Sequence, residues 1–451
     1  MTFAQIVAIV IFGVMFAAII YGRVHRVIPA CIGAALTIIV VFLGIQRSPE
    51  TVIKVLNIGQ LGLGKFWLPG HEPLESTGVN WQTIIFIFGM MTMIEGLSRV
   101  GFFRWLCLAV AKMVHYRVVP IFICFILLSG FLSMFIDSIT VMLFLTTVII
   151  ELARLLKFDP VPMIIAAIFA ANTGGSATMS GDPPNIIIGT AFGFTFIHFL
   201  TNTGPIAWAG MILTLGFFYI VYRRSLKSQY QNGMAPEKYP EPKEAITNRR
   251  PFLINAGIFL LMIVLLITHA QTGLSVALIG VIVAVLTMIS AGKHALHVIR
   301  GVDWRTLLFF FGLFICVGGL EETGTLKALA DAIEAFSGGS PLAVMSIIIW
   351  ISAFLSAIVD NIPFAATMVP VIFDLSKMPG MNLQTLSWTL ALGTDIGGNA
   401  TPIGASANVV GTAIAEREGY RIGWGRFMKS ALPCMILVIA LSQLLLMVRY
   451  L

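Results

Sequence analysis

Two apolar regions of the chain are interrupted by polar, glycine-rich stretches: Asn172-Thr-Gly-Gly-Ser-Ala-Thr-Met-Ser-Gly-Asp-Pro-Pro-Asn185 and Asp395-Ile-Gly-Gly-Asn-Ala-Thr-Pro-Ile-Gly-Ala-Ser-Ala-Asn408. Paired glycines and prolines break the hydrogen-bond ladder of a helix, so neither stretch can be continuous helix. Within a bilayer, the freed backbone groups are tolerated only where protein or a wet cavity surrounds them. Such breaks offer half-helix N-termini to anions and carbonyl oxygens to cations, so both stretches predict an ion or substrate site. The alternative is a kink that binds nothing.

The composition places these stretches in a membrane protein. Of the 451 residues, 58% are hydrophobic and 11% are charged, whereas soluble domains carry about 25% charged residues. The polar surface is therefore too small for a water-soluble enzyme, a secreted disulfide scaffold or a disordered regulator. The net charge of +7 indicates basic cytoplasmic loops and no nucleic-acid partner. The five cysteines follow no metal-binding or CxxC spacing, and we expect no cofactor.

The chain also contains an internal duplication. When the sequence is slid against itself until Trp81 lies on Trp304, positions 81–189 align with 304–412 without a gap. Among the other matched pairs are Gly89 with Gly312, Asp137 with Asp360, Gly175 with Gly398 and Asn185 with Asn408. We therefore predict a first repeat at 1–222, a polar cytoplasmic linker at 223–250 and a second repeat at 251–451.

Each repeat is expected to span the membrane five times. Apolar runs of the required length lie at 3–20, 27–45, 81–98, 205–222, 252–268, 273–290, 304–320 and 431–449. Regions 162–190 and 385–413 add one broken span to each repeat. Regions 117–157 and 340–376 are expected to be re-entrant helical hairpins.

Basic residues orient these segments, because Lys and Arg accumulate in cytoplasmic loops. Besides the 223–250 linker, the residues placed inside are Arg23, Arg26, Arg99, Arg104, Lys112, Arg117, Arg154, Lys157, Lys293, Arg300, Arg305, Arg421, Arg426 and Lys429. Segments 191–204 and 269–272 contain no Lys or Arg and are placed outside. An odd number of spans in each half then makes the repeats inverted. The predicted fold is an all-α polytopic membrane protein with two inverted repeats, an architecture typical of secondary transporters.

Four carboxylates lie deep inside apolar sequence: Asp137, Asp182, Asp360 and Asp395. An aspartate at the centre of a membrane helix costs about 2.5–3.5 kcal/mol, so four of them require a reason. The functional interpretation is that they bind a coupling proton or sodium ion. The structural alternative is that they cap half-helices by accepting from free N–H groups.

The motifs Gly181-Asp-Pro-Pro-Asn185, Asp360-Asn-Ile-Pro-Phe364 and Gly397-Gly-Asn-Ala-Thr-Pro-Ile-Gly-Ala-Ser-Ala-Asn408 resemble those of the ion transporter superfamily. The most similar branch is that of arsenite permeases and the pink-eyed-dilution (P) protein, and the sodium/dicarboxylate symporters are more distant. The resemblance implies a scaffold part and a transport part, a homodimer, an elevator-type mechanism and a location in the plasma (inner) membrane.

The resemblance also implies ion sites where the hairpin tips face the broken helices. Together with polar neighbours, the candidate ion- and substrate-binding residues are Asp137, Ser138, Thr140, Asn172, Gly175, Thr178, Asp182, Asn185, Asp360, Asn361, Thr367, Asp395, Gly398, Asn399, Thr401, Ser406 and Asn408. A sodium ion is expected at Asp137, Ser138, Asn185, Asp360, Asn361 and Asn408.

The substrate follows from how this sequence departs from the superfamily. In dicarboxylate symporters both tips resemble Ser-Asn-Thr, whereas this chain has Asp137-Ser-Ile and Asp360-Asn-Ile. Carboxylates repel a dicarboxylate, and neither motif contains Lys or Arg. The leading hypothesis is a proton-coupled exporter of arsenite or antimonite, followed by a sodium/proton antiporter and then a sodium-coupled anion symporter.

Other classes fit the sequence less well, and we do not expect an enzyme. An intramembrane aspartyl protease usually resembles Gly-x-Gly-Asp, but Asp182 follows Met179-Ser-Gly and Asp395 follows Leu392-Gly-Thr. Hairpins that enter from both sides suit alternating access better than an open channel. The sequence has no GxxxxGK[ST] loop, so transport driven by ATP would need a separate ATPase subunit.

Overall fold

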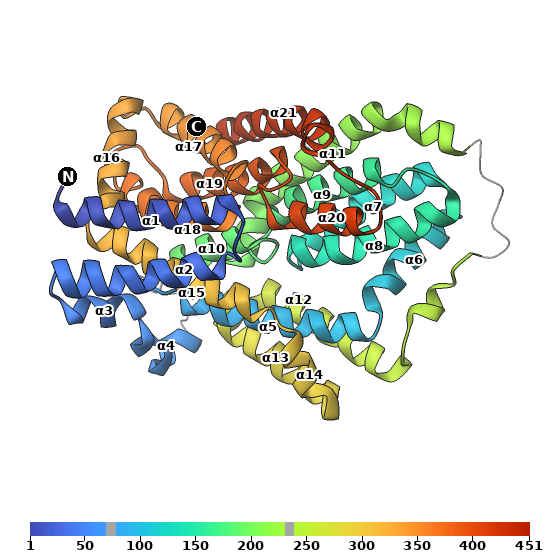
Figure 1. Ribbon diagram of the computed structural model, residues 1–451, viewed down its shortest axis with the longest axis horizontal. Coiled ribbons are helices and arrows are strands. Elements are labelled where there is room, and N and C mark those ends of the chain that lie inside the picture. Colours follow the sequence, from blue (N-terminus) through green and yellow to red (C-terminus); the bar gives the residue numbers. More distant parts are fainter. Residues whose placement is uncertain (69–77, 231–238) are drawn as a thin grey trace.

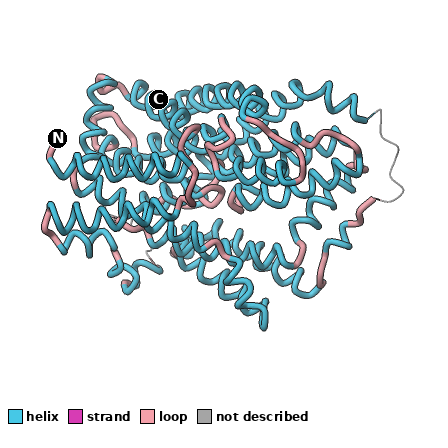
Figure 2. Tube along the Cα trace, viewed as in Figure 1, coloured by secondary structure: helices cyan, strands magenta, loops and turns pink. Residues whose placement is uncertain are grey.

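The computed structural model describes residues 1–68, 78–230 and 239–451. Within these ranges every regular element is a helix (Figure 2). Nine of the described helical segments are long and apolar enough to cross a membrane. The predicted all-α polytopic fold is therefore confirmed.

The first half of the chain forms three long apolar helices, a hairpin, a broken helix and a final long helix (Figure 1). Its elements are α1 (Phe3–Tyr21), α2 (Val27–Leu36), η1 (Thr37–Ile45), α3 (Pro49–Leu56), η2 (Ile58–Gly62), α4 (Gly64–Trp67), α5 (Trp81–Arg99), α6 (Phe102–Met113), α7 (Val118–Ser133), α8 (Ser138–Leu156), α9 (Val161–Gly175), α10 (Pro183–Phe192) and α11 (Phe196–Tyr230).

The second half repeats this order. Its elements are η3 (Pro242–Ala245), α12 (Arg249–Thr272), α13 (Val276–Ala291), η4 (Gly292–His294), α14 (Ala295–Gly301), α15 (Trp304–Glu322), α16 (Thr325–Ser337), α17 (Pro341–Ser356), α18 (Asn361–Leu375), α19 (Leu383–Gly397), η5 (Gly398–Ala400), α20 (Ser406–Arg417) and α21 (Trp424–Tyr450). Helices α15 and α17 begin and end at the positions that the repeat alignment matches to the ends of α5 and α7. Helices α18 and α20 likewise begin at the positions matched to the starts of α8 and α10. The duplication seen in the sequence thus extends to the helix boundaries.

Both predicted breaks and both predicted hairpins are present. Region 162–190 divides into α9 and α10, and region 385–413 divides into α19, η5 and α20. Helices α7 and α8 form the first hairpin, and α17 and α18 form the second. In Figure 1 the two hairpins lie toward opposite ends of the long axis. The orientation of the repeats in a membrane and the domain boundaries remain predictions.

The packing interlocks the two halves. Helix α5 packs on α13 and α2 packs on α15, so each half contributes to both long-helix pairs. Helix α7 packs on α9 and α17 on α19, while the outer hairpin arms α8 and α18 contact α20 and α10 of the other repeat. Glycine permits the hairpin contact: a Cβ on Gly174 would lie 2.2 Å from the carbonyl oxygen of Gly130. This arrangement brings both breaks and both hairpin turns together.

Candidate ion-binding site

Asp182 is the point at which the two hairpin tips meet. It precedes α10 and is only 3% exposed. The Ser138 hydroxyl, at the start of α8, donates to Asp182 Oδ1 at 2.9 Å. The Asn361 amide, at the start of α18, donates to Asp182 Oδ2 at 2.6 Å. One carboxylate therefore joins both hairpins to the first broken helix.

Asp395 lies beside this carboxylate and is fully buried within α19. Its polar neighbours include Asp182, Asn185 and Asn361. In the described part of the chain, neither carboxylate oxygen of Asp395 makes a hydrogen bond of ordinary length and geometry. Two adjacent buried carboxylates repel each other unless a proton or cation lies between them. The pair is therefore chemically suited to bind a coupling ion.

Capping, the structural alternative, separates the four aspartates into two groups. Asp137 accepts from the Thr140 backbone N–H at 2.9 Å and caps α8, and Asp360 occupies the matched cap of α18. Asp182 stands at the N-cap of α10 without making a side-chain cap, and Asp395 lies inside its helix. Capping thus accounts for the pair that the repeat alignment matches. Capping does not account for Asp182 and Asp395, which the repeat alignment does not match to each other.

Asn185 and Asn408 hold the two helix breaks together in the same way. The Asn185 amide donates to the carbonyl oxygens of Gly175 and Thr178, both at 3.0 Å. The Asn408 amide donates to the matched carbonyls of the second repeat, those of Gly398 and Thr401, at 2.8 and 2.7 Å. These asparagines satisfy carbonyls that the breaks release, as a buried backbone requires. The carbonyls predicted as ion ligands at the two glycines therefore already have partners.

A third asparagine, Asn172, connects the two breaks. Its amide donates to Asn399 Oδ1 at 2.9 Å and to Asn408 Oδ1 at 2.8 Å. Within the described residues, the side-chain oxygens of Asn172 and Asn185 and the amide nitrogen of Asn399 have no hydrogen-bond partner. Buried amide groups left in this condition are uncommon, and they indicate a place where a ligand or water completes the bonding.

The hydroxyl groups of three other candidate threonines bond to carbonyls outside this cluster of carboxylates and asparagines. The hydroxyls of Thr178 and Thr401 donate to the carbonyls of Met134 and Ala357, which belong to the hairpin turns. The Thr367 hydroxyl donates to a carbonyl of its own helix at 2.8 Å, so the structure does not bring it into the cluster. In the described ranges no three His, Cys, Asp or Glu side chains are placed to hold a metal.

Asp360 has a partner that the sequence did not indicate. Arg26 Nη1 donates to Asp360 Oδ2 at 2.6 Å and to Ser406 Oγ at 2.8 Å. Its Nη2 donates to Thr306 Oγ1 at 3.1 Å, and the guanidinium lies 5.0 Å from the centre of the Phe309 ring. The loop-charge rule predicts Arg26 only as a cytoplasmic basic residue. Arg26 and Asp360 lie far apart in the sequence and form no motif together, so the sequence does not indicate their contact. An aspartate in apolar sequence needs a counter-ion, and this requirement is the signal that could have indicated a basic partner for Asp360.

The first tip has no comparable partner among the described residues. Asp137 Oδ2 accepts from the Thr140 hydroxyl at 2.8 Å. The aspartate borders a cavity of about 30 Å³, whose other lining residues are Ile87, Met90, Met91, Ile139, Ser180, Pro183, Ile186, Thr306, Phe310 and Ile362. Among the described residues that line this cavity, none is basic.

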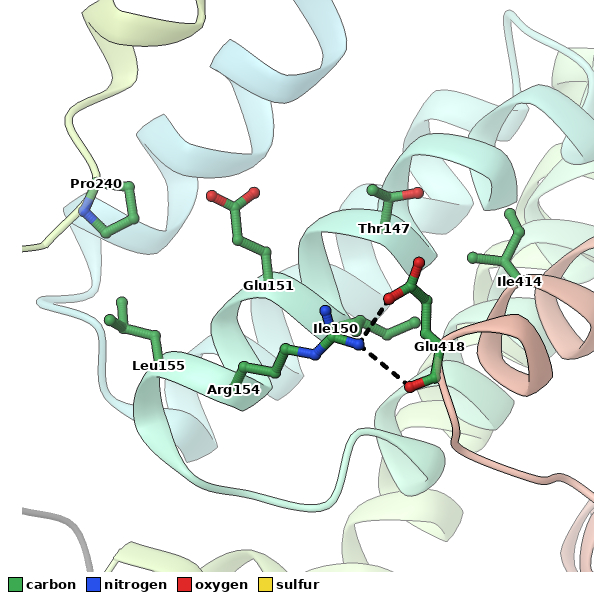
Figure 3. Close-up of a pocket in the computed structure, with 8 residues that line it drawn as sticks. All are labelled: Thr147, Ile150, Glu151, Arg154, Leu155, Pro240, Ile414 and Glu418. Atoms are coloured by element: carbon green, nitrogen blue, oxygen red, sulfur yellow. Dashed lines mark hydrogen bonds and ion pairs between the residues drawn. The ribbon is translucent and has the colours of Figure 1, made fainter.

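Charged recesses lie at the outer ends of the hairpins, away from the carboxylate pair. One, of about 540 Å³, is lined by Thr147, Ile150, Glu151, Arg154, Leu155, Pro240, Ile414 and Glu418 (Figure 3). There Arg154 reaches from α8 to the Glu418 carboxylate at 2.6 Å. The other, of about 450 Å³, contains Asp374 and Lys377 at the positions that match Glu151 and Arg154. Each outer hairpin arm, with the turn that follows α18 included, thus carries an acidic and a basic residue that line a recess.

Comparison with known proteins supports a transporter. The family model described as CitMHS, citrate transporter, matches residues 14–393. A 46 kDa membrane protein of Mycobacterium leprae is 33% identical over an alignment of 457 residues, which covers 99% of each chain. The human P protein is 27% identical over 528 aligned residues. That alignment covers 98% of this chain and 60% of the P protein, so the chain spans about three fifths of this relative.

Solved structures agree on the fold. The YdaH transporter of Alcanivorax borkumensis has a TM-score of 0.58 at 14% identity and covers 90% of this chain and 89% of its own. MtrF of Neisseria gonorrhoeae has a TM-score of 0.56 at 12% identity, with 89% and 85% covered. The resemblance to the superfamily that includes the P protein is confirmed by the relatives, and the chain belongs to the CitMHS citrate transporter family.

Proposed function

We propose that this protein is a secondary active transporter in which Asp182 and Asp395 bind the coupling ion, a proton or sodium. The observation that carries the proposal is the juxtaposition of two buried carboxylates, one of which makes no hydrogen bond of ordinary length and geometry in the described residues. Such a pair is stable when one proton or cation is shared between them. Because Ser138 and Asn361 hold Asp182, occupancy of the pair is linked to the position of both hairpin tips.

The proposed mechanism is of the elevator type, with inverted repeats. The hairpins pack on the broken helices, and the outer arms α8 and α18 also contact the opposite repeat, so these elements form one body. Helices α2, α5, α13 and α15 pack pairwise and form a frame beside this body, which α5 contacts at α10 and α15 contacts at α18. A body bound to ion and substrate would move along the frame and expose its site alternately to the two sides of the membrane. We propose a homodimer in the plasma (inner) membrane; an ATPase subunit would be required only for transport driven by ATP.

As substrate we propose arsenite or antimonite. The two motifs contain no basic residue, although Arg26, which lies outside them in the sequence, contacts Asp360. The substrate proposal is retained because these two charges balance each other and add no net attraction for an anion. The hydroxyl and amide groups of the cluster suit a neutral trihydroxide, which binds through hydrogen bonds. A sodium/proton antiporter would use the same carboxylates and is the second candidate.

The test uses purified protein in liposomes that contain a pH-sensitive dye and carry an imposed proton gradient. Arsenite, antimonite, sodium, lithium, citrate and succinate are added in turn to wild type, Asp395→Asn and Asp182→Asn. The matched control is Asp374→Asn, which changes a carboxylate of α18 that pairs with Lys377 near the surface. We expect arsenite or antimonite to move protons in wild type and in the control but not in the other two variants.

Two results would contradict the proposal. Wild-type proton movement in Asp395→Asn would remove the carboxylate pair from the coupling site. A response to citrate or succinate, with none to arsenite, antimonite, sodium or lithium, would replace the proposed substrate with a carboxylate. A response to sodium or lithium alone would select the antiporter and retain the ion site.

A further inference from the structure

Arg26 is held at the second hairpin tip by groups from three separate elements. Asp360 belongs to the turn between α17 and α18, Ser406 begins α20, and Thr306 and Phe309 belong to α15. The side chains of Arg26 and Asp360 are only 18% and 13% exposed. An arginine that served only to mark a cytoplasmic loop would be solvated, so these contacts require another explanation.

The contacts of Asp360 leave little capacity for a further ligand. Its Oδ2 accepts from Arg26 at 2.6 Å and from the Ser406 hydroxyl at 2.9 Å. Its Oδ1 faces the backbone N–H of Ile362 at 3.5 Å, in the cap position. A mobile cation at this carboxylate would lie beside the guanidinium, and like charges at such distances in a poorly solvated place repel strongly.

The same positions in the first repeat keep the aspartate, the threonine and the phenylalanine, but Pro183 replaces Ser406 and the arginine is missing. Asp137 matches Asp360, and Thr83 and Phe86 match Thr306 and Phe309. The residue that precedes α13, as Arg26 precedes α2, is Ser275. Its hydroxyl accepts from the Leu278 N–H at 3.1 Å and caps its own helix. The repeat thus provides an internal comparison: within the described ranges, one tip has a cation and the other has none.

We propose that Arg26 is a tethered counter-cation that occupies the second hairpin tip in the state that this structure shows, and that in this state it excludes a mobile coupling ion from Asp360. Arg26 is therefore a specificity-determining residue, because it reduces the number of carboxylates open to mobile ions. The proposal rests on the proposed function for the existence of coupling ions. The claim that Asp360 needs a cation, and that Arg26 supplies this cation, does not depend on which substrate is transported.

The experiment asks whether a free cation replaces the missing side chain. Purified Arg26→Ala is heated in detergent with millimolar guanidinium chloride, and its apparent Tm is compared with that in sodium chloride and in equimolar urea. Urea has nearly the same shape as guanidinium but no charge. We expect Arg26→Ala to lose several degrees of Tm and to recover most of the loss with guanidinium, in a saturable manner, but not with urea.

Two further variants separate this effect from a general loss of packing. Arg23→Ala removes an exposed arginine of the same turn, which lies over the Tyr21 ring, and should respond to neither additive. Arg26→Gln combined with Asp360→Asn removes both charges and keeps hydrogen-bonding groups at the two positions. This double variant should be more stable than Arg26→Ala, and guanidinium should not change its Tm. If Arg26→Ala does not fold, this double variant and wild type still test the expected stability of the neutral pair.

Several outcomes would overturn the proposal. They are a wild-type Tm for Arg26→Ala, equal recovery with urea and guanidinium, and a guanidinium response that persists in the double variant. An unstable double variant would also overturn it, because the charges would then not be the reason for the contact. All these readouts are obtained without transport, so they stand even if the substrate or the coupling pair is assigned wrongly.

Discussion

The two hairpin tips have matched sequences and matched helix starts, but their aspartates have different partners. At the first tip, Asp137 accepts from Thr140, which lies in the first turn of the helix that Asp137 caps. At the second tip, Asp360 has an arginine brought from near the other end of the chain. The duplication has therefore preserved the backbone of the tips while their electrostatics diverged. The comparison teaches that repeat symmetry predicts where a side chain lies better than it predicts its charged partners.

The sharpest test of this difference changes both aspartates in the same way. Asp360→Asn leaves Arg26 partly buried without a counter-charge and should lower the unfolding free energy by about 3 kcal/mol. Asp137→Asn should change it by less than about 0.5 kcal/mol, because asparagine caps a helix as well as aspartate does. Apparent Tm and chemical denaturation in the same detergent would measure both. Equal losses in the two variants would show that Arg26 does not distinguish the tips.

A second test examines positions at which the repeats should behave alike. A Cβ on Gly174 would lie 2.2 Å from the Gly130 carbonyl oxygen, and one on Gly397 would lie 2.3 Å from the Ala353 Cα. Both clashes involve backbone, so Gly174→Ala and Gly397→Ala should each destabilise by about 1–3 kcal/mol. Gly257→Ala is the control, since its Cβ would meet nothing within 4 Å and alanine favours a helix by about 1 kcal/mol.

The result is read from the ratio of the two losses in apparent Tm. Similar losses would support a common packing of hairpin on broken helix in both repeats. A loss confined to one variant would mean that the halves pack differently and that the repeat match is limited to helix boundaries.

Much of the fold was accessible from the sequence because its signals are local or periodic. Glycine and proline marked the breaks, the length of the apolar runs marked the spans, and the fixed offset marked the duplication. The carboxylate pair was found only as separate residues, because Asp182 and Asp395 occupy unmatched positions. Their proximity results from tertiary packing, as does the contact of Arg26, which no spacing rule describes.

The smallest effect concerns two threonines that the sequence assigned to the site together. Thr140 donates its hydroxyl to Asp137 Oδ2 at 2.8 Å, whereas Thr367 donates to Pro363 within its own helix. Thr140→Val should therefore cost about 1 kcal/mol, or about fivefold in a transport rate that depends on the first tip. Thr367→Val keeps the shape of the side chain and loses only a hydrogen bond to a carbonyl of its own helix. The transport rate should therefore stay within about twofold of the wild-type rate. Proton movement in liposomes measures both variants. A larger loss for Thr367→Val than for Thr140→Val would mean that the hydroxyl of Thr367 turns toward the ion site in another state of the transport cycle, and that the tips differ less than their side-chain contacts indicate.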